Sequence, residues 1–172
     1  MLGYLSFESS LGWLVVAESS EGIALVDFLG PKRPSEEVIV SSILREYPKA
    51  APEPRDDAGL RGEAKAAILR YLEERKPLPG IRLDLRKGTV FDQSVWKAIA
   101  AIPFGETRSY TQIAAAAGSP GAVRAAGRAC GRNHVPLFIP CHRVVASGGK
   151  LGGFSGGLDI KRALLDLESA GR

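Results

Sequence analysis

The stretch Ile139-Pro140-Cys141-His142-Arg143-Val144-Val145 places one of the chain's two cysteines directly beside one of its two histidines. The thiolate is the reactive form of cysteine, and a neighbouring imidazole and the Arg143 cation would both favour it. Pro140 restricts the backbone that leads into this apolar segment. Successive residues of an extended segment point to opposite faces, so we expect a bridging water rather than a direct Cys141–His142 hydrogen bond. The stretch predicts a nucleophilic cysteine.

The two halves of the chain differ in charge. Residues 1–86 carry 12 Lys and Arg against 14 Asp and Glu, whereas residues 87–172 carry 11 against 5. No acidic residue occurs from Thr107 to Leu158, which indicates a polyanionic partner such as DNA or RNA. A solvated basic surface explains this charge equally well. We therefore expect two domains, 1–86 and 87–172, and the first, which lacks Cys and His, is interpreted as a structural module.

The first domain is expected to form a small sheet with helices. Alternating and β-branched residues predict strands over 3–8, 11–18 and 22–29, and a half-buried strand over 81–85. Helices are expected from Ser35 to about Tyr47 and from Asp57 to about Lys76. Residues 50–55 contain two prolines and are expected to form a loop.

The second domain contains the outline of a helix-turn-helix. Helices are expected over 89–101, 110–117, 122–131 and 158–170, and a Gly/Pro turn joins the middle two. Arg124, Arg128 and Arg132 are spaced four residues apart, so a helix would align them along one face. The residues between them are small, which favours close approach to a nucleic acid. An exposed basic helix packed on its own core is the alternative.

Composition narrows the cellular setting. No apolar run approaches the roughly 20 residues of a membrane span, and the first residues lack the basic start of a signal peptide. Two cysteines do not form a disulfide framework, and a reactive thiol suits a reducing compartment. We expect a cytoplasmic protein, or a nuclear one in a eukaryote, without a membrane partner.

Further segments extend the pattern around Cys141. They are Thr89–Trp96, Ile102–Tyr110, Val123–Gly127, Asn133, Pro140–Val144, Ser155–Gly157 and Leu164–Glu168. Together they resemble the O6-alkylguanine-DNA alkyltransferases, also called methylated-DNA–protein-cysteine methyltransferases. The resemblance implies an α+β fold, with a ribonuclease-H-like small antiparallel sheet with helices followed by a winged-helix-like helix-turn-helix domain. It also implies DNA repair by irreversible, single-use transfer of the alkyl group of O6-alkylguanine, and of O4-alkylthymine, to Cys141, without a cofactor.

The resemblance further implies roles for individual residues. A relay from Glu168 through His142 and a water would deprotonate Cys141, with Tyr110 and Asn133 assisting. Arg124 would occupy the space left by a flipped nucleotide, in the minor groove of double-stranded DNA. The remaining DNA-binding residues would be Tyr110, Thr111, Ser119, Arg128 and Ser147, and the alkyl and base pocket would comprise Pro136, Arg143, Val144, Phe154 and Ser155. A monomer without a metal is expected.

Three other interpretations stay open. The first is a protein that binds alkylated DNA without transfer, although such relatives lack the cysteine. The second is a cysteine hydrolase using Cys141, His142 and Glu168, for which adjacent Cys and His are poorly placed. The third is a zinc site formed by Cys130, His134, Cys141 and His142. Phe154 and Ser119 also depart from residues that some members of the resembled family carry, which bears on substrate range.

Overall fold

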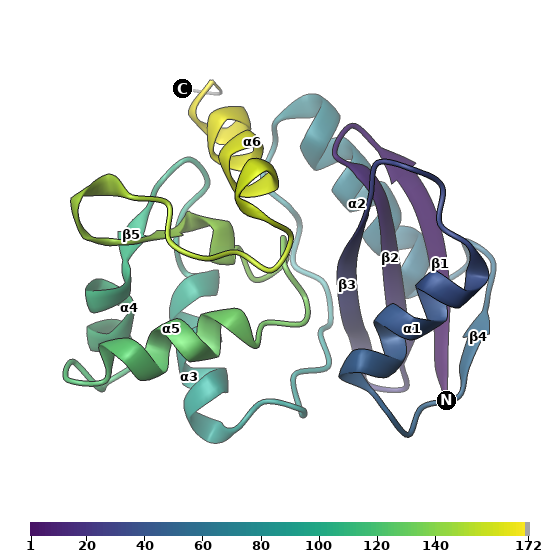
Figure 1. Cartoon of the computed structure of the whole chain (residues 1–172), viewed down its shortest axis with the longest axis horizontal. Helices are drawn as coiled ribbons and strands as arrows, with labels where there is room; N and C mark the ends of the chain where they lie inside the picture. Colours follow the sequence, from purple (N-terminus) through teal and green to yellow (C-terminus); the bar gives the residue numbers. More distant parts are fainter. Residues whose placement is uncertain (171–172) are drawn as a thin grey trace. The chain divides into compact units, whose positions relative to one another are not determined.

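The computed structural model describes residues 1–170, which form two compact units (Figure 1). The first comprises Met1–Asp84 and the second begins at Leu85. The division lies two residues before the boundary expected from the change in charge. No helix within the described residues is long and apolar enough to span a membrane.

Three strands of the first unit form an antiparallel meander, as expected. They are β1 (Leu2–Ser9), β2 (Gly12–Ser19) and β3 (Gly22–Gly30), and each adjacent pair is joined by a two-residue turn. The Ser9 hydroxyl closes the first turn by donating to the Gly12 carbonyl at 2.8 Å. Gly12 has φ 96°, a backbone conformation that glycine adopts at low cost.

The expectation of a loop over residues 50–55 is wrong. Pro52–Pro54 form β4, which pairs in parallel with β1 at the edge of the sheet, giving the order β3-β2-β1-β4. The Arg55 N–H continues this pairing by donating to the Tyr4 carbonyl at 2.8 Å. An edge strand tolerates proline because only one of its sides needs backbone donors. The sheet is therefore mixed rather than wholly antiparallel.

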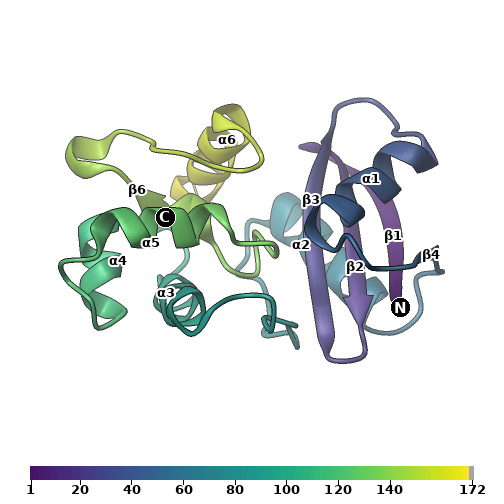
Figure 2. The same cartoon turned by 60° about the horizontal axis from the view of Figure 1, so that its bottom comes forward.

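Two helices cover the two faces of this sheet (Figures 1 and 2). Helix α1 (Glu36–Glu46) is capped by Ser35 and buries Ile39 and Ile43 against the sheet. Helix α2 (Leu60–Glu74) begins three residues after the expected Asp57. Asp57 instead forms an ion pair with Lys65 at 2.6 Å.

The segment 81–85 pairs less extensively than expected. Leu83 forms a single parallel bridge with Ile23, whose N–H donates to the Arg82 carbonyl at 2.9 Å. Asp84 is the buried residue of the segment and accepts a 2.6 Å hydrogen bond from the Ser19 hydroxyl. The Ser19 hydroxyl supplies the hydrogen bond that this buried carboxylate needs. The polar residue of the segment therefore points inward, where the alternation predicted apolar residues.

The second unit contains four α-helices that match the expected positions. They are α3 (Val90–Ala100), α4 (Tyr110–Ala116), α5 (Val123–Gly131) and α6 (Leu158–Ser169). Reciprocal hydrogen bonds between Thr89 and Asp92 cap α3, and Gly118, with φ 79°, ends α4 before the turn to α5. β5 (Arg108–Ser109) pairs in parallel with β6 (Val144–Val145), so the residues after Cys141 lie beside the start of α4.

Trp96 fixes α5 against α3. Its side chain is 1% exposed, and its Nε1–H donates to the Ala129 carbonyl of α5 at 2.8 Å. The ring also meets His134 edge to face, with centroids 5.1 Å apart. The expected core role of this helix face is confirmed, because Val95 and Ile99 are fully buried as well. This packing determines where α5 presents its remaining residues.

Gly88 tests the packing of Trp96. A Cβ at this position would overlap Cζ3 and Cη2 of the buried indole, which its hydrogen bond to Ala129 holds in place. We expect Gly88→Ala to lower the free energy of unfolding by about 1–3 kcal/mol in denaturant titrations, the usual cost of overpacking. Gly121→Ala is the control because a Cβ there meets no atom within 4 Å. Equal stability of the two variants would contradict this packing.

Candidate active site

Cys141 lies on a turn and not on a strand, which corrects the expectation of an extended segment. Cys141–Arg143 form a single 3₁₀ turn that follows Pro140, and β6 begins only at Val144. Neighbouring side chains on a 3₁₀ turn diverge by about 120° and not by the half-turn of a strand. The side chains of Cys141 and His142 are both buried, at 6% and 0% exposure.

Asn133 connects the end of α5 to the Cys141 turn. Its Nδ2 donates to the Cys141 sulfur at 3.1 Å and to the Ile139 carbonyl at 2.9 Å. Its Oδ1 accepts the Val135 N–H at 3.0 Å, which fixes the orientation of the amide. Asn133 is itself 5% exposed. The expected connection between α5 and the Cys141 segment is therefore present, and the sulfur receives a hydrogen bond that favours its anionic form.

Burial of the Cys141 thiol nevertheless works against its anionic form. Burial raises the pKa of Cys141 to about 11, against the effect of the Asn133 amide, the Lys161 charge and the backbone N–H groups of Cys141 and His142. The cation that favours the thiolate is Lys161 and not, as expected, Arg143, because the guanidinium of Arg143 is paired with another side chain. A thiol in this state reacts only when a base removes its proton.

Glu168 is the centre of a buried network beside the turn. The carboxylate is 1% exposed, and its Oε1 lies 2.8 Å from His142 Nε2. Arg143 donates to it through Nε and Nη2, each at 2.9 Å, and the Gly105 N–H donates at 3.0 Å. The loop that contains Gly105 and the Cys141–Arg143 turn, which are distant in sequence, thus converge on one side chain of α6.

His142 is held as a neutral imidazole. Burial lowers its pKa, although the adjacent Glu168 acts in the opposite direction. Because the carboxylate accepts from Nε2, we assign the proton to that nitrogen, and Nδ1 is then the acceptor nitrogen of the ring. The Glu168–His142 pair is therefore arranged as the relay requires, with a base that can take up a proton.

Arg143 belongs to this network and not to the surface of a pocket. Beyond Glu168, its Nη1 donates to the Ile102 carbonyl at 2.7 Å, and its guanidinium lies 5.7 Å from the Phe104 ring centroid. Arg143 was expected to line the alkyl and base pocket. It is instead paired with Glu168, because a buried carboxylate needs a cationic partner.

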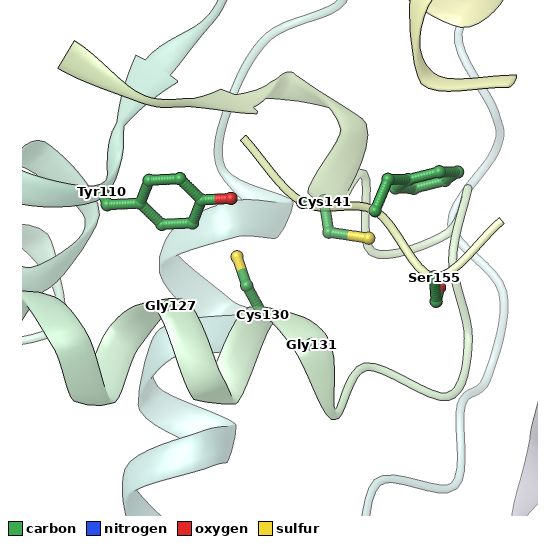
Figure 3. Close-up of a pocket in the computed structure, with 8 residues that line it drawn as sticks. Tyr110, Gly127, Cys130, Gly131, Cys141 and Ser155 are labelled. Carbon is green, nitrogen blue, oxygen red and sulfur yellow. The ribbon is translucent and has the colours of Figure 1, made fainter. Parts of the chain in front are cut away.

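A cavity of about 150 Å³ opens beside the Cys141 sulfur (Figure 3). Its lining consists of Tyr110, Gly127, Cys130, Gly131, Cys141, Gly153, Phe154 and Ser155. Figure 3 shows the Tyr110 hydroxyl and the Cys130 sulfur near each other on one side of Cys141, whereas the Cys141 sulfur points toward the side of Ser155. The volume is below the roughly 300–1,000 Å³ of drug-sized sites, so the cavity suits a small group or one flat ring.

Three of the expected pocket or catalytic residues, Tyr110, Phe154 and Ser155, thus share the cavity with Cys141. Pro136 and Val144 are buried but lie outside the lining formed by residues 1–170. Cys130, which was considered above as a zinc ligand, also lines the cavity, and burial raises its pKa to about 12.

The expected DNA-binding residues lie on the helix-turn-helix and in a nearby loop. Arg124 and Arg128 are exposed on α5, Thr111 is exposed on α4, and Ser147 is exposed after β6. Ser119 is half-buried in the turn between α4 and α5.

Arg132 departs from the expected three-arginine face. Its Nε and Nη2 donate to the two carboxylate oxygens of Asp92, the buried capping residue of α3. Burial alone would raise the pKa of Asp92, but the hydrogen bonds from Arg132 and Thr89 lower it below its usual value. The charge of Arg132 is therefore used within the unit, and the basic face of α5 comprises Arg124 and Arg128.

Lys161 is a residue of the site that the sequence did not indicate. It is 0% exposed and donates to the Val144 carbonyl at 2.5 Å and the Gly153 carbonyl at 3.1 Å. Lys161, Leu164 and Glu168 follow the i, i+3, i+7 spacing of one helix face, and all three are buried. That shared spacing with Glu168 was the signal available in the sequence.

The zinc interpretation finds no support. Across residues 1–170, the structure forms no group of three or more His, Cys, Asp and Glu side chains that could hold a metal ion. His142 is oriented by Glu168, and His134 is buried against Trp96.

Comparison with known proteins places this site in a family. Residues 90–170 match the family model described as 6-O-methylguanine DNA methyltransferase, DNA binding domain. A Methanosarcina acetivorans methylated-DNA–protein-cysteine methyltransferase is 37% identical over 171 residues, covering 97% of this chain and 98% of the relative. The Mycobacterium tuberculosis protein of the same name is 56% identical over 90 residues, 52% of this chain. That alignment spans about half of the relative's length, 54%.

Superposition on solved structures leads to the same family. It superposes on the crystal structure of Mycobacterium tuberculosis OGT in complex with DNA with a TM-score of 0.81 and 36% identity, covering 98% of this chain and 93% of that one. Fold and site together define a methyltransferase whose reactive group is a buried cysteine. The chain belongs to the methylated-DNA–protein-cysteine methyltransferase family, and its expected class of activity, DNA repair by alkyl transfer to a protein cysteine, is that of the family.

Arg143→Met tests the network around Glu168. The substitution keeps an unbranched apolar stem but leaves the Glu168 carboxylate buried without its cation. We expect the free energy of unfolding to fall by about 3–5 kcal/mol in urea titrations. Arg128→Met, at an exposed position of α5, should change it by less than about 0.5 kcal/mol. Similar losses in the two variants would show that the Arg143–Glu168 pair does not stabilise the unit.

Proposed function

We propose that Cys141 is the alkyl acceptor and that the chain repairs duplex DNA carrying O6-alkylguanine, and also O4-alkylthymine, by one irreversible transfer per molecule. The observation that carries this proposal is the placement of the Cys141 sulfur. It lies at a small cavity, hydrogen-bonded by Asn133, beside a histidine that a buried glutamate orients. Soft sulfur suits attack on an alkyl carbon, and the thioether formed has no ready leaving group.

The proposed transfer balances without a cofactor. The thiol proton passes through a bridging water to Nδ1 of His142, while Glu168 stabilises the charge on the ring. The sulfur forms a bond to the alkyl carbon as the bond from that carbon to O6 breaks, and its electron pair stays with the base. The Tyr110 hydroxyl, in the wall of the cavity, donates to the base as negative charge develops. Guanine takes up a proton at N1, so the thiol loses the proton that the base gains.

Base flipping is required because the alkyl carbon of a paired guanine lies inside the duplex. We assign the minor groove to the helix-turn-helix, with Arg124 occupying the vacated space and Arg128 near the phosphates. Both side chains are exposed on α5, and Gly127 and Gly131 leave the same helix open toward the cavity. The TM-score of 0.81 to a DNA-bound relative supports a DNA partner.

The roles of the remaining residues are assigned from where their side chains lie. Tyr110 serves both the flipped phosphate and the base, and Thr111, Ser119 and Ser147 are proposed to contact the DNA backbone. Phe154 and Ser155 line the cavity, whereas Pro136 and Val144 are buried outside its lining. We propose that the protein acts as a monomer in the cytoplasm, or in the nucleus of a eukaryote.

Mass spectrometry after mixing with duplex DNA tests the acceptor. With a duplex bearing one O6-methylguanine in excess, we expect one added methyl group on the peptide that contains Cys141 and none on the peptide that contains Cys130. Cys141→Ala should retain binding to the duplex and gain no methyl group. An unmodified native protein that still holds the damaged duplex would instead support a binding-only function.

Arg124→Ala separates flipping from chemistry. Loss of the side chain leaves the gap in the stack unfilled, so the single-turnover rate on duplex DNA should fall by about 10–100-fold, the cost of a few kcal/mol for unstacking. The rate with free O6-alkylguanine base should stay within about 3-fold, since no stack is opened.

Arg162→Ala is the matched control for this comparison. It removes the same charge from an exposed position on α6, outside the helix-turn-helix. Its rate on the duplex should remain close to that of the native protein. If Arg124→Ala slowed the reactions of duplex and free base equally, the role proposed for Arg124 would be wrong.

A further inference from the structure

Lys161 is a charged side chain in the interior of the second unit. It is 0% exposed, and burial lowers its pKa. Removing an ammonium group from water is costly unless other groups replace the lost hydration. Its hydrogen-bond partners are the main-chain carbonyls of Val144 and Gly153, at 2.5 and 3.1 Å. A lysine on the inward face of α6 therefore points to a function that an apolar residue could not provide.

The two carbonyls belong to two different segments of the second unit. Val144 follows directly after the Cys141–Arg143 turn, which carries the sulfur. Gly153 lines the cavity, and its backbone N–H donates to the Tyr110 hydroxyl. Lys161 thus joins the segment that carries Cys141 to the wall that positions Tyr110 through a single ammonium group.

The charge of Lys161 also acts on the sulfur. The Asn133 amide donates to the Cys141 sulfur, and the titratable groups that interact electrostatically with the Cys141 thiol are Lys161 from α6, Cys130 from α5 and Tyr110 from α4. Among them only Lys161 is a cation, because the guanidinium of Arg143 is paired with Glu168. An ammonium group in a low-dielectric site stabilises a nearby anion far more than it would in water.

We propose that Lys161 is a positioning residue for alkyl transfer, which clamps the Val144 and Gly153 carbonyls and supplies the positive charge that stabilises the Cys141 thiolate as it forms. This inference rests on the proposed role of Cys141 as acceptor. It gives the buried lysine two functions that an apolar residue cannot provide, one geometric and one electrostatic.

Two substitutions separate these functions from simple packing. Lys161→Met keeps the length and removes the charge, and Lys161→Arg keeps the charge. The control is Lys150→Met, at an exposed position of the glycine-rich loop. Each protein is treated with iodoacetamide between pH 6 and 10, and alkylation of the Cys141 peptide is followed by mass spectrometry. This probe needs no DNA, so it reports on the thiol alone.

We expect the reaction of Lys161→Met at neutral pH to be at least about 10-fold slower, with its rise shifted by about one pH unit to higher pH, since one unit of thiol pKa is a tenfold change in thiolate. Lys161→Arg should restore the pH profile in large part, and Lys150→Met should match the native protein. Methyl transfer from duplex DNA should slow in parallel, whereas affinity for the duplex stays unchanged. Native-like iodoacetamide rates and profile in Lys161→Met would overturn the proposal.

Should Lys161→Met fail to fold, the native chain supplies the test. Nitrogen-15 NMR of the lysine ammonium groups should show one buried signal that changes with the same pH midpoint as Cys141 reactivity, and a signal that ignores this midpoint would overturn the proposal. The two proposals also fail separately. If duplex DNA leaves Cys141 unmethylated while Lys161→Met still shifts the iodoacetamide profile, the acceptor role fails and the electrostatic role of Lys161 stands.

Discussion

The buried carboxylate of Glu168 is the constraint on which the site depends. It gathers His142, Arg143 and the Gly105 N–H around one side chain of α6 that is 1% exposed. A buried charge is tolerable only when cations and donors surround it, so the chain must bring the 103–107 loop and the Cys141 turn to α6 before the network can form. The orientation of the histidine and the anchoring of the Cys141 turn are two results of this one requirement.

Helix α5 serves two surfaces at once. Arg124 and Arg128 are exposed along it, while Gly127, Cys130 and Gly131 line the cavity at the Cys141 sulfur. Trp96 fixes the helix from α3, and Asn133 connects its end to the sulfur. Because burial raises the pKa of Cys141 to about 11, the thiol is held in its unreactive form until its proton can leave. The exposed arginines and the cavity at the cysteine are therefore joined through a single short helix and the residue that follows it.

Much of this could be predicted from the sequence, because local signals dominated. Thr89 and Ser109 cap their helices, and the Cys141–His142 pair indicated a reactive cysteine, whereas the part of Glu168 came from the family resemblance. The failures arose where long-range partners override local pattern. Arg132 binds Asp92, forty residues away, so the even spacing of the three arginines did not show that one of them is paired with a carboxylate. The spacing that Lys161 shares with Glu168 placed it on the inward face of α6, but its acceptors are backbone carbonyls, which the sequence does not identify. β4 formed in spite of its prolines because an edge strand needs donors on one side only.

The most direct test of the relay is the protonation state of His142, read by nitrogen-15 NMR of its imidazole ring in the unmodified protein. If Glu168 orients the ring as described, Nε2 carries the proton, Nδ1 is the acceptor, and the ring stays neutral to a pH below the ordinary histidine value of about 6.5, because burial lowers its pKa. A proton on Nδ1, or an imidazolium ion that persists at neutral pH, would contradict the proposed transfer of the Cys141 proton to His142.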